Sequence, residues 1–230
     1  MTQLSGKEKS LYVQDIFTRI ASRYDLMNRL MTGGQDGRWR QEVIQRARLT
    51  PRARLLDLGA GTGDLAREAL RQQPAAQVVA ADFALAMLRV GQRRRASQWV
   101  AADARHLPFP PAAFDAVVSG FLMRNVGDVQ PVLAEQWRVL RPGGRVVILD
   151  TTRPTRHWLS PAIWIHLHLV IPFIGGLVSG FRNAYTYLPD STESFLRAEA
   201  LADRLTAAGF RQVGFRRRML GTIALHWGEK

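Results

Sequence analysis

The stretch LLDLGAGTGDLA, residues 55–66, constrains the fold of this chain more than any other feature. A short, mostly apolar run is followed by three glycines at alternate positions. A run of this kind bounded by glycine is typical of a buried strand. Glycine also lets the backbone approach a ligand where a β-carbon would intrude. The stretch therefore predicts a strand that leads into a turn with a bound partner.

The chain from residue 54 onward alternates short β-branched runs with amphipathic helical stretches. This alternation predicts an α/β fold, in which a mostly parallel sheet carries helices on both faces. The last two strands are separated only by a tight turn near Leu220 and Gly221, so we expect them to pair antiparallel. We predict seven strands, at residues 54–59, 77–83, 97–102, 114–121, 145–151, 211–218 and 222–228.

Two segments fall outside this predicted core. Residues 7–48 read as helices and form a candidate cap. Residues 153–190 form an insertion after the fifth strand, and His157 to Phe181 contains no Asp, Glu, Lys or Arg. That length reaches the range of a membrane-spanning helix. Two prolines, a Gly-Gly pair and the histidines at 166 and 168 within it oppose spanning, so we expect a broken apolar lid or an interfacial hairpin.

Length and composition indicate one domain. A chain of 230 residues with 47% hydrophobic content can bury one α/β core and a small appendage. The absence of cysteine excludes disulfides, a thiolate metal site and a cysteine nucleophile. The polar N-terminus lacks a signal-peptide pattern, so we expect a cytoplasmic protein. The expected parts are a cap (1–50), a ligand-binding core (51–152), the apolar lid (153–190) and a C-terminal helix and hairpin (191–230).

The formal net charge of +13 attracts nucleic acid, anionic membranes and acidic substrates alike. Nearly all of the positive charge is arginine, and the clusters at 93–95 and 216–218 lack interleaved aromatic residues that could stack on bases. The pattern favours a solvated basic surface first and attraction to an anionic membrane second. We expect no nucleic-acid partner.

Informative side chains follow the predicted strands. Ligands of an open α/β sheet bind beyond the carboxyl ends of its strands. Asp82 lies about twenty residues after the glycines, the distance at which an acidic side chain meets ribose hydroxyls. The candidates are Asp57, Gly59, Gly61, Thr62 and Gly63 after the first strand, Asp82 and Phe83 after the second, Asp103 and Ala104 after the third, and Gly120, Arg124 and Asn125 after the fourth.

The glycine spacing disfavours a dinucleotide. The NAD pattern is G-x-G-x-x-G, whereas this loop reads G-x-G-x-G and is followed at once by Asp64, which would repel a pyrophosphate. Asp57 and Asp64 instead suit a ligand that carries an ammonium and a sulfonium. The motifs LLDLGAGTGD, AADF and AADARHLPF together resemble the class I S-adenosylmethionine-dependent methyltransferases across roughly residues 50–150. This resemblance implies a Rossmann-like fold and S-adenosylmethionine as cofactor.

A finer resemblance rests on YDLMN (24–28), Trp39, LPFP (107–110), RNV (124–126) and RVLRPGG (138–144). With IPFIGGLVSG and YTYLPDS in the insertion, the chain resembles the ubiquinone/menaquinone C-methyltransferase family, often called UbiE/MenG, over nearly its whole length. The resemblance implies methyl transfer to a ring carbon of a polyprenylated quinol such as demethylmenaquinol. Holding both reactants in attack geometry supplies roughly 7 to 11 kcal/mol, so we expect no metal.

Each candidate residue then receives a role. We expect the backbone at Gly59 to Gly63 to contact the methionine part of the cofactor, with Asp57 near its ammonium. We expect Asp82 to bind the ribose and Asp103 with Ala104 to meet the adenine. Arg124 is the first catalytic candidate, as a stabiliser of phenolate charge, and Tyr24 the second, as a proton relay. The candidates for substrate binding are Tyr24, Asn28, Arg124, Asn125, His166 and Tyr185.

Alternative functions stay open at this point. Departures from the family pattern at Asp36, Gly120, Leu122 and Asp150 allow a phospholipid N-methyltransferase or a secondary-metabolite methyltransferase. A non-enzymatic alternative is a lipid- or nucleic-acid-binding module that retains the fold. For a lipid-like substrate, the apolar segment 157–181 and its flanking arginines predict peripheral contact with an anionic membrane.

Overall fold

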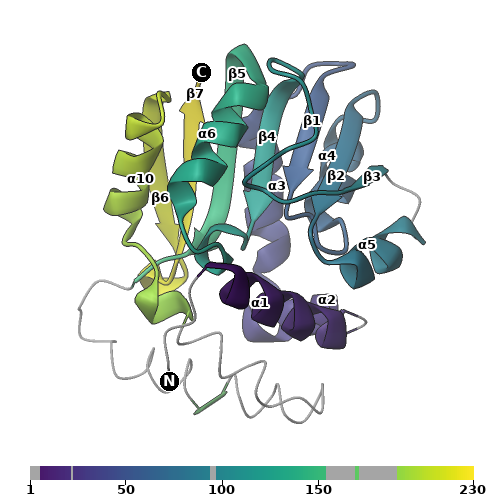
Figure 1. Cartoon of the computed structure of the whole chain (residues 1–230), viewed down its shortest axis with the longest axis vertical. Coiled ribbons are helices and arrows are strands. Elements are labelled where there is room, and N and C mark those ends of the chain that lie inside the picture. Colours follow the sequence, from purple (N-terminus) through teal and green to yellow (C-terminus); the bar gives the residue numbers. More distant parts are fainter. Residues whose placement is uncertain (1–5, 22, 94–96, 154–168, 171–190) are drawn as a thin grey trace.

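The computed structural model describes residues 6–21, 23–93, 97–153, 169–170 and 191–230. Its centre is one seven-stranded sheet of order β3-β2-β1-β4-β5-β7-β6, which confirms the predicted α/β fold (Figure 1). The strands are β1 (Arg54–Leu58), β2 (Gln77–Asp82), β3 (Gln98–Ala101), β4 (Phe114–Gly120), β5 (Leu140–Thr151), β6 (Arg211–Arg218) and β7 (Ile223–Glu229).

Strand directions also follow the prediction. The first five strands pair parallel to one another, and β7 pairs antiparallel with both β5 and β6. The turn that reverses the chain, Met219–Gly221, holds three consecutive residues at positive φ of 46°, 52° and 85°. Only the last of these is glycine, and such a tight reversal leaves no room for a crossover helix.

Strand β5 begins at Leu140, five residues before the predicted start. The sequence Arg141 to Gly144 is typical of a turn, yet it extends the strand across a register shift in the pairing with β4. The backbone of Lys230 accounts for this, because its carbonyl accepts from Gly143 at 2.8 Å and its N–H donates to Gly144 at 2.9 Å. The far end of the chain thus supplies pairing that no local pattern reveals.

Helices cover both faces of the sheet (Figure 1). Side chains alternate between the faces of a strand, so Leu56 and Leu58 pack into the core under α6 and α10, whereas Leu55 packs into the core under α3 and α4. The helices are α3 (Asp36–Ala47), α4 (Asp64–Gln72), α5 (Leu85–Gln92), α6 (Val129–Val139) and α10 (Ala198–Ala207).

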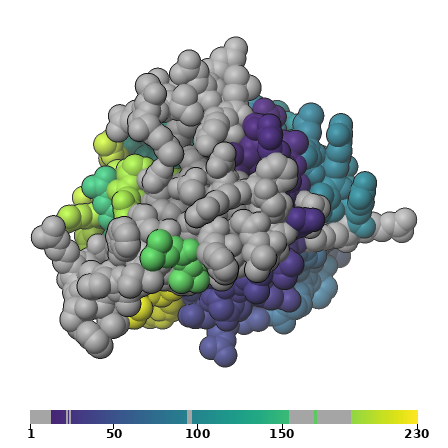
Figure 2. Space-filling view, turned by 90° about the horizontal axis from the view of Figure 1, so that it is seen from below, coloured from purple at the N-terminus to yellow at the C-terminus, as the bar shows by residue number. Residues whose placement is uncertain are grey.

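Of the predicted cap, residues 7–48, only α1 (Gly6–Ile20) and α2 (Tyr24–Met31) lie at the carboxyl end of the parallel strands. Helix α3 packs on a face of the sheet against β4 and β5 instead, because its apolar side chains belong to the sheet core. Helix α1 packs beside α5, and the view from below shows the two side by side (Figure 2). Two hydrogen bonds tie the cap to residues that follow strands. Gln14 Nε2 donates to the carbonyl of Phe83 at 3.4 Å, and the Thr62 hydroxyl donates to Asp25 at 2.6 Å.

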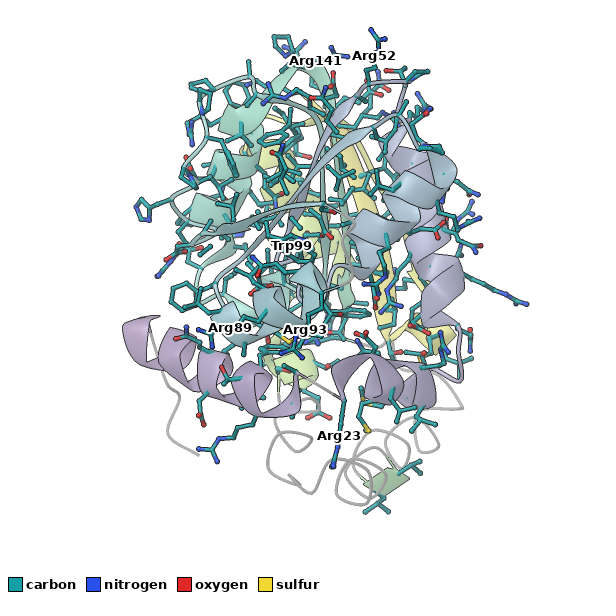
Figure 3. All side chains as sticks on the ribbon, turned by 90° about the vertical axis from the view of Figure 1, so that its right-hand side faces the viewer. Arg23, Arg52, Arg89, Arg93, Trp99 and Arg141 are labelled. Atoms are coloured by element: carbon teal, nitrogen blue, oxygen red, sulfur yellow. The ribbon has the colours of Figure 1, made fainter. Side chains whose placement is uncertain are left out.

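Several predictions fall on residues outside the described part of the chain, namely His166, Tyr185 and nearly all of the apolar segment 157–181. Within the described ranges, no helix is both long enough and apolar enough to cross a bilayer. Arginines are spread over the molecule: Arg52 and Arg141 lie at the end of the sheet opposite the cap, and Arg23 lies at the cap (Figure 3).

Candidate active site

The glycine loop after β1 is fixed to the end of β2. Gly59, Gly61 and Gly63 all have positive φ, between 57° and 84°, which glycine adopts without strain. The N–H of Gly59 donates to the carbonyl of Ala81 at 2.8 Å, and the N–H of Gly61 donates to Oδ2 of Asp82 at 2.7 Å. The loop is therefore held by one backbone and one side-chain acceptor of β2, and its residues line two cavities.

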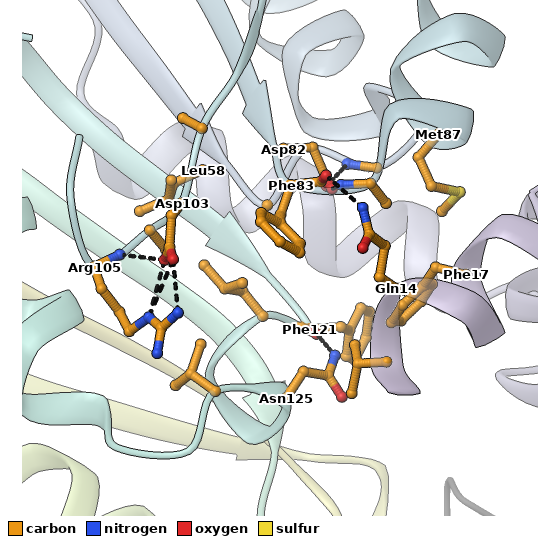
Figure 4. A pocket seen from close by; sticks show the side chains of 18 of the residues that line it. Gln14, Phe17, Leu58, Asp82, Phe83, Met87, Asp103, Arg105, Phe121 and Asn125 are labelled. Atoms are coloured by element: carbon orange, nitrogen blue, oxygen red, sulfur yellow. Dashed lines mark hydrogen bonds and ion pairs between the residues drawn. The ribbon is translucent and has the colours of Figure 1, made fainter. Parts of the chain in front are cut away.

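The first cavity lies between the strand ends and the cap (Figure 4). It brings together the predicted cofactor residues that follow four different strands. Helix α1 closes one side with Val13, Gln14 and Phe17, which the sequence analysis assigned only to a cap. The predicted residues in its lining are Gly59, Gly61, Asp82, Phe83, Asp103, Ala104, Gly120 and Asn125.

Two carboxylates give this cavity its polar character. Burial raises the pKa of Asp82, although its oxygens accept from the N–H groups of Ala84 and Gly61, each at 2.7 Å. The pKa of Asp103 is lowered because the guanidinium of Arg105 binds it, with a closest distance of 2.7 Å. Both groups are acceptors, as recognition of hydroxyl and amine groups requires.

A second cavity lies on the other side of the glycine loop, and it shares Gly59, Gly61, Gly120 and Phe121 with the first. Its polar lining comes from four elements and the loop, with Asp64 at the start of α4 and Thr62 in the loop. Asn28 belongs to α2, Arg40 to α3, and Asp57 to β1. The sequence analysis missed Arg40, which stands beside Trp39 in an ordinary helical pattern.

Asp57 has the most strongly shifted pKa among the described residues of the second cavity. It is 1% exposed, and its Oδ2 accepts from the N–H of Ala66 at 2.9 Å. Its Oδ1 is buried and has no hydrogen-bond partner among the described residues. Burial raises the pKa of Asp57 to about 7. A buried carboxylate with one free oxygen is a site that a cationic ligand would complete.

The rest of the loop has structural partners. Gly63 faces the ring of Trp99, which a β-carbon at Gly63 would approach to 2.5 Å. Asp64 forms ion pairs with Arg40, at 2.7 Å, and with Arg67. These arginines offset the charge of Asp64, so it adds less negative potential to the site than the sequence analysis expected.

Arg124 lies in a short helical turn, η1 (Met123–Asn125), and is not among the described residues that line either cavity. Its guanidinium forms an ion pair with Asp150 at 2.8 Å, and its centre lies 5.0 Å from the ring of Phe121. The next residue, Asn125, lines the cavity and donates to the carbonyl of Phe121 at 2.9 Å. Tyr24 begins α2, and its side chain is outside the described part of the chain.

Leu122 fills the space over Gly59. A β-carbon at Gly59 would come within 2.9 Å of the Leu122 side chain, which also lines the first cavity. Position 122 is one of the departures from the family pattern named above. The leucine side chain there forms part of the wall of the first cavity.

Comparisons with known proteins agree with this geometry. The model of the ubiE/COQ5 methyltransferase family matches residues 3–230. The ubiquinone/menaquinone biosynthesis C-methyltransferase UbiE of Desulfotalea psychrophila is 46% identical over 221 residues, which cover 95% of this chain and 90% of that protein. The demethylmenaquinone methyltransferase of Thermus thermophilus is 42% identical over 220 residues, which cover 94% of this chain and 100% of that protein.

Solved structures share the fold at low sequence identity. The [4+2]-cyclase SpnF superposes with a TM-score of 0.69 at 17% identity, covering 95% of this chain and 94% of that one. A possible histamine N-methyltransferase from Thermotoga maritima gives a TM-score of 0.65 at 19% identity, covering 94% and 99%. At such identities the likeness concerns the architecture alone.

Proposed function

This chain belongs to the ubiE/COQ5 methyltransferase family and is an S-adenosylmethionine-dependent methyltransferase, and we propose that its acceptor is a ring carbon of a polyprenylated quinol. The observation that carries the choice of acceptor is the match of nearly the whole chain to proteins named for demethylmenaquinone and ubiquinone/menaquinone methylation.

The residues at the strand ends fit the cofactor. When bound, S-adenosylmethionine supplies an electrophilic methyl group on a sulfonium. The unpartnered Oδ1 of Asp57 suits the ammonium of its amino-acid end, because a cation there would satisfy the buried carboxylate. Asp82 and Asp103 line the other cavity, where their carboxylates are acceptors suited to the hydroxyl or amine groups of an adenosine.

The acceptor side needs positioning and charge stabilisation. Loss of a proton from a quinol hydroxyl makes the adjacent ring carbon a nucleophile, and the ring carbon releases its own proton after it gains the methyl group. Arg124 is our candidate for stabilising the phenolate charge, because a buried guanidinium acts in a low-dielectric surrounding. Asn125, in the cavity wall, and Tyr24, His166 and Tyr185 are the further candidates for contacting the quinol.

A polyprenyl tail also calls for an apolar surface, since each buried CH₂ is worth about 0.8 kcal/mol. We propose peripheral contact with an anionic membrane on the cap side. Leu26 and Leu30, one turn apart on α2, are 52% and 43% exposed, and Arg29 lies beside them. Flotation with anionic liposomes at low salt tests this. Absence of lipid binding there would remove the membrane proposal and leave the acceptor untouched.

The acceptor is tested directly with labelled S-adenosylmethionine. The protein is incubated separately with a reduced short-chain demethylmenaquinol, its oxidised quinone and phosphatidylethanolamine. We expect label on a ring carbon of the quinol and none on the quinone, whose ring is electron-poor. Transfer to phosphatidylethanolamine with none to the quinol would overturn the proposal in favour of a phospholipid methyltransferase.

A further inference from the structure

The second cavity contains a buried hydrogen-bond donor that has no partner among the described residues. Asn28 on α2 is 8% exposed, and its Nδ2 has no hydrogen-bond partner in the described part of the chain. Amide groups buried without a partner are uncommon, because such a group loses its bonds to water and gains none. An amide N–H₂ group supplies two donors, so this position calls for an acceptor.

Arg40 supplies positive charge to the same cavity. It is the one Arg or Lys among the described residues of that lining. Asp36 and Asp64 hold its two terminal nitrogens, the latter at 2.7 Å. A guanidinium has five N–H groups in a planar fork, so these two bonds leave three for a ligand. The two carboxylates thus fix the orientation of Arg40 without exhausting its donors.

The cavity therefore carries two complementary needs. Asp57 offers an unpartnered acceptor with negative charge, whereas Asn28 offers a neutral amide donor and Arg40 offers donors with positive charge. An α-amino acid end, with its ammonium and its carboxylate on one carbon, meets both needs at once. A ligand end with an ammonium and no acceptor would satisfy Asp57 and leave the amide of Asn28 without an acceptor.

We propose that Asn28 and Arg40 bind the carboxylate at the amino-acid end of S-adenosylmethionine, the methyl donor, while Asp57 binds its ammonium. This replaces the role in quinol binding predicted for Asn28 from the sequence. The same helix carries Asp25, which accepts from the Thr62 hydroxyl of the glycine loop at 2.6 Å. Asp25 and Asn28 lie one turn apart on α2. The carboxylate would therefore join the cap helices to the glycine loop.

The test compares two ligands that differ in one group. Calorimetry measures binding of S-adenosylmethionine and of its decarboxylated analogue, which keeps the ammonium and lacks the carboxylate. We expect the wild-type protein to bind the intact donor at least about tenfold more tightly, as a charge-assisted contact provides. Asn28→Leu and Arg40→Met should each reduce that ratio toward one, mainly by weakening the intact donor.

The ratio of the two affinities does not depend on folding defects, because partial unfolding of a variant weakens the binding of both ligands by the same factor. Asp57→Asn should weaken both ligands and preserve the ratio. Arg38→Met, an exposed position on the same helix outside the cavity, should change neither affinity. A wild-type ratio retained in both Asn28→Leu and Arg40→Met would overturn the proposal. No acceptor is present, so the outcome is separate from the test of the quinol.

Discussion

Asp150 accepts two hydrogen bonds from Arg124. Its Oδ1 accepts from the guanidinium at 2.8 Å, and its Oδ2 accepts from the backbone N–H of Arg124 at 3.2 Å. The two side chains are 5% and 1% exposed, so the pair is buried. The end of β5 thereby fixes the loop that follows β4, including Asn125 in the cavity wall.

Asp150→Asn should destabilise the protein by about 3–5 kcal/mol, because it leaves a buried guanidinium without a counter-charge. Asp150→Glu keeps the negative charge, so this variant should lose less stability than Asp150→Asn. Urea unfolding followed by fluorescence measures both variants. Equal midpoints for the wild-type protein and Asp150→Asn would show that the pair contributes nothing to folding.

Arg124→Lys separates catalysis from charge balance. Lysine keeps the positive charge opposite Asp150 but loses the planar fork. We expect donor affinity close to the wild-type value and turnover with quinol reduced on the order of 10²-fold, the effect typical of losing one group that stabilises developing charge. Steady-state kinetics with a short-chain quinol gives the answer, and near-normal turnover would remove Arg124 from the mechanism.

Donor binding should weaken as the pH falls below 7. Asp57 has a pKa of about 7 in the unliganded protein, and it binds an ammonium only in its ionised form. Below that pKa a proton must leave before the donor binds, so Kd should rise by up to about tenfold per pH unit. Calorimetry is carried out from pH 7 to 5.5, because the amino group of S-adenosylmethionine, with a pKa of about 8, stays protonated in this range. Asp57→Asn should bind weakly and without this pH dependence.

The same carboxylate should lower the stability of the unliganded protein at alkaline pH. The folded pKa of Asp57 is raised to about 7 from 3.8, so its favourable contribution is full below pH ~4 and is lost as the pH rises through ~7. Asp57→Asn should therefore melt at a higher temperature than the wild-type protein at pH 8. At pH 4 the difference should be smaller. A difference that does not change with pH would contradict the assigned pKa.

Packing at Trp99 gives a prediction independent of function. A β-carbon at Gly91 would overlap the Trp99 ring, so Gly91→Ala should cost about 1–3 kcal/mol through overpacking. Adding Trp99→Leu should remove much of that cost. Gly37→Ala is the matched control, because nothing lies within 4 Å of its β-carbon and its φ is not positive. That change should be neutral or slightly stabilising.

The sequence predicted most of the fold because its signals are local. Alternating apolar runs mark the strands, and the glycines after β1 mark the loop. Asp82 and Asp103 lie together because the carboxyl ends of parallel strands meet at one edge of the sheet. The early start of β5 escaped prediction because its partner is Lys230, which is near in space and remote in sequence.

The partners within the site were harder to foresee. Arg40 enters the second cavity only because α3 packs against α2 and the sheet, and because Asp36 and Asp64 orient its guanidinium. Its sequence neighbourhood is that of any amphipathic helix. The pairing of Arg124 with Asp150 depends on the register between β4 and β5, which a single sequence does not specify.

The most direct measurement is a crystal structure with S-adenosylhomocysteine bound. We expect the amino-acid end to lie in the second cavity against Asp57, and the adenosine to lie in the first cavity between Asp82 and Asp103. An empty site at saturating ligand would overturn this assignment, and so would density with the two ends reversed.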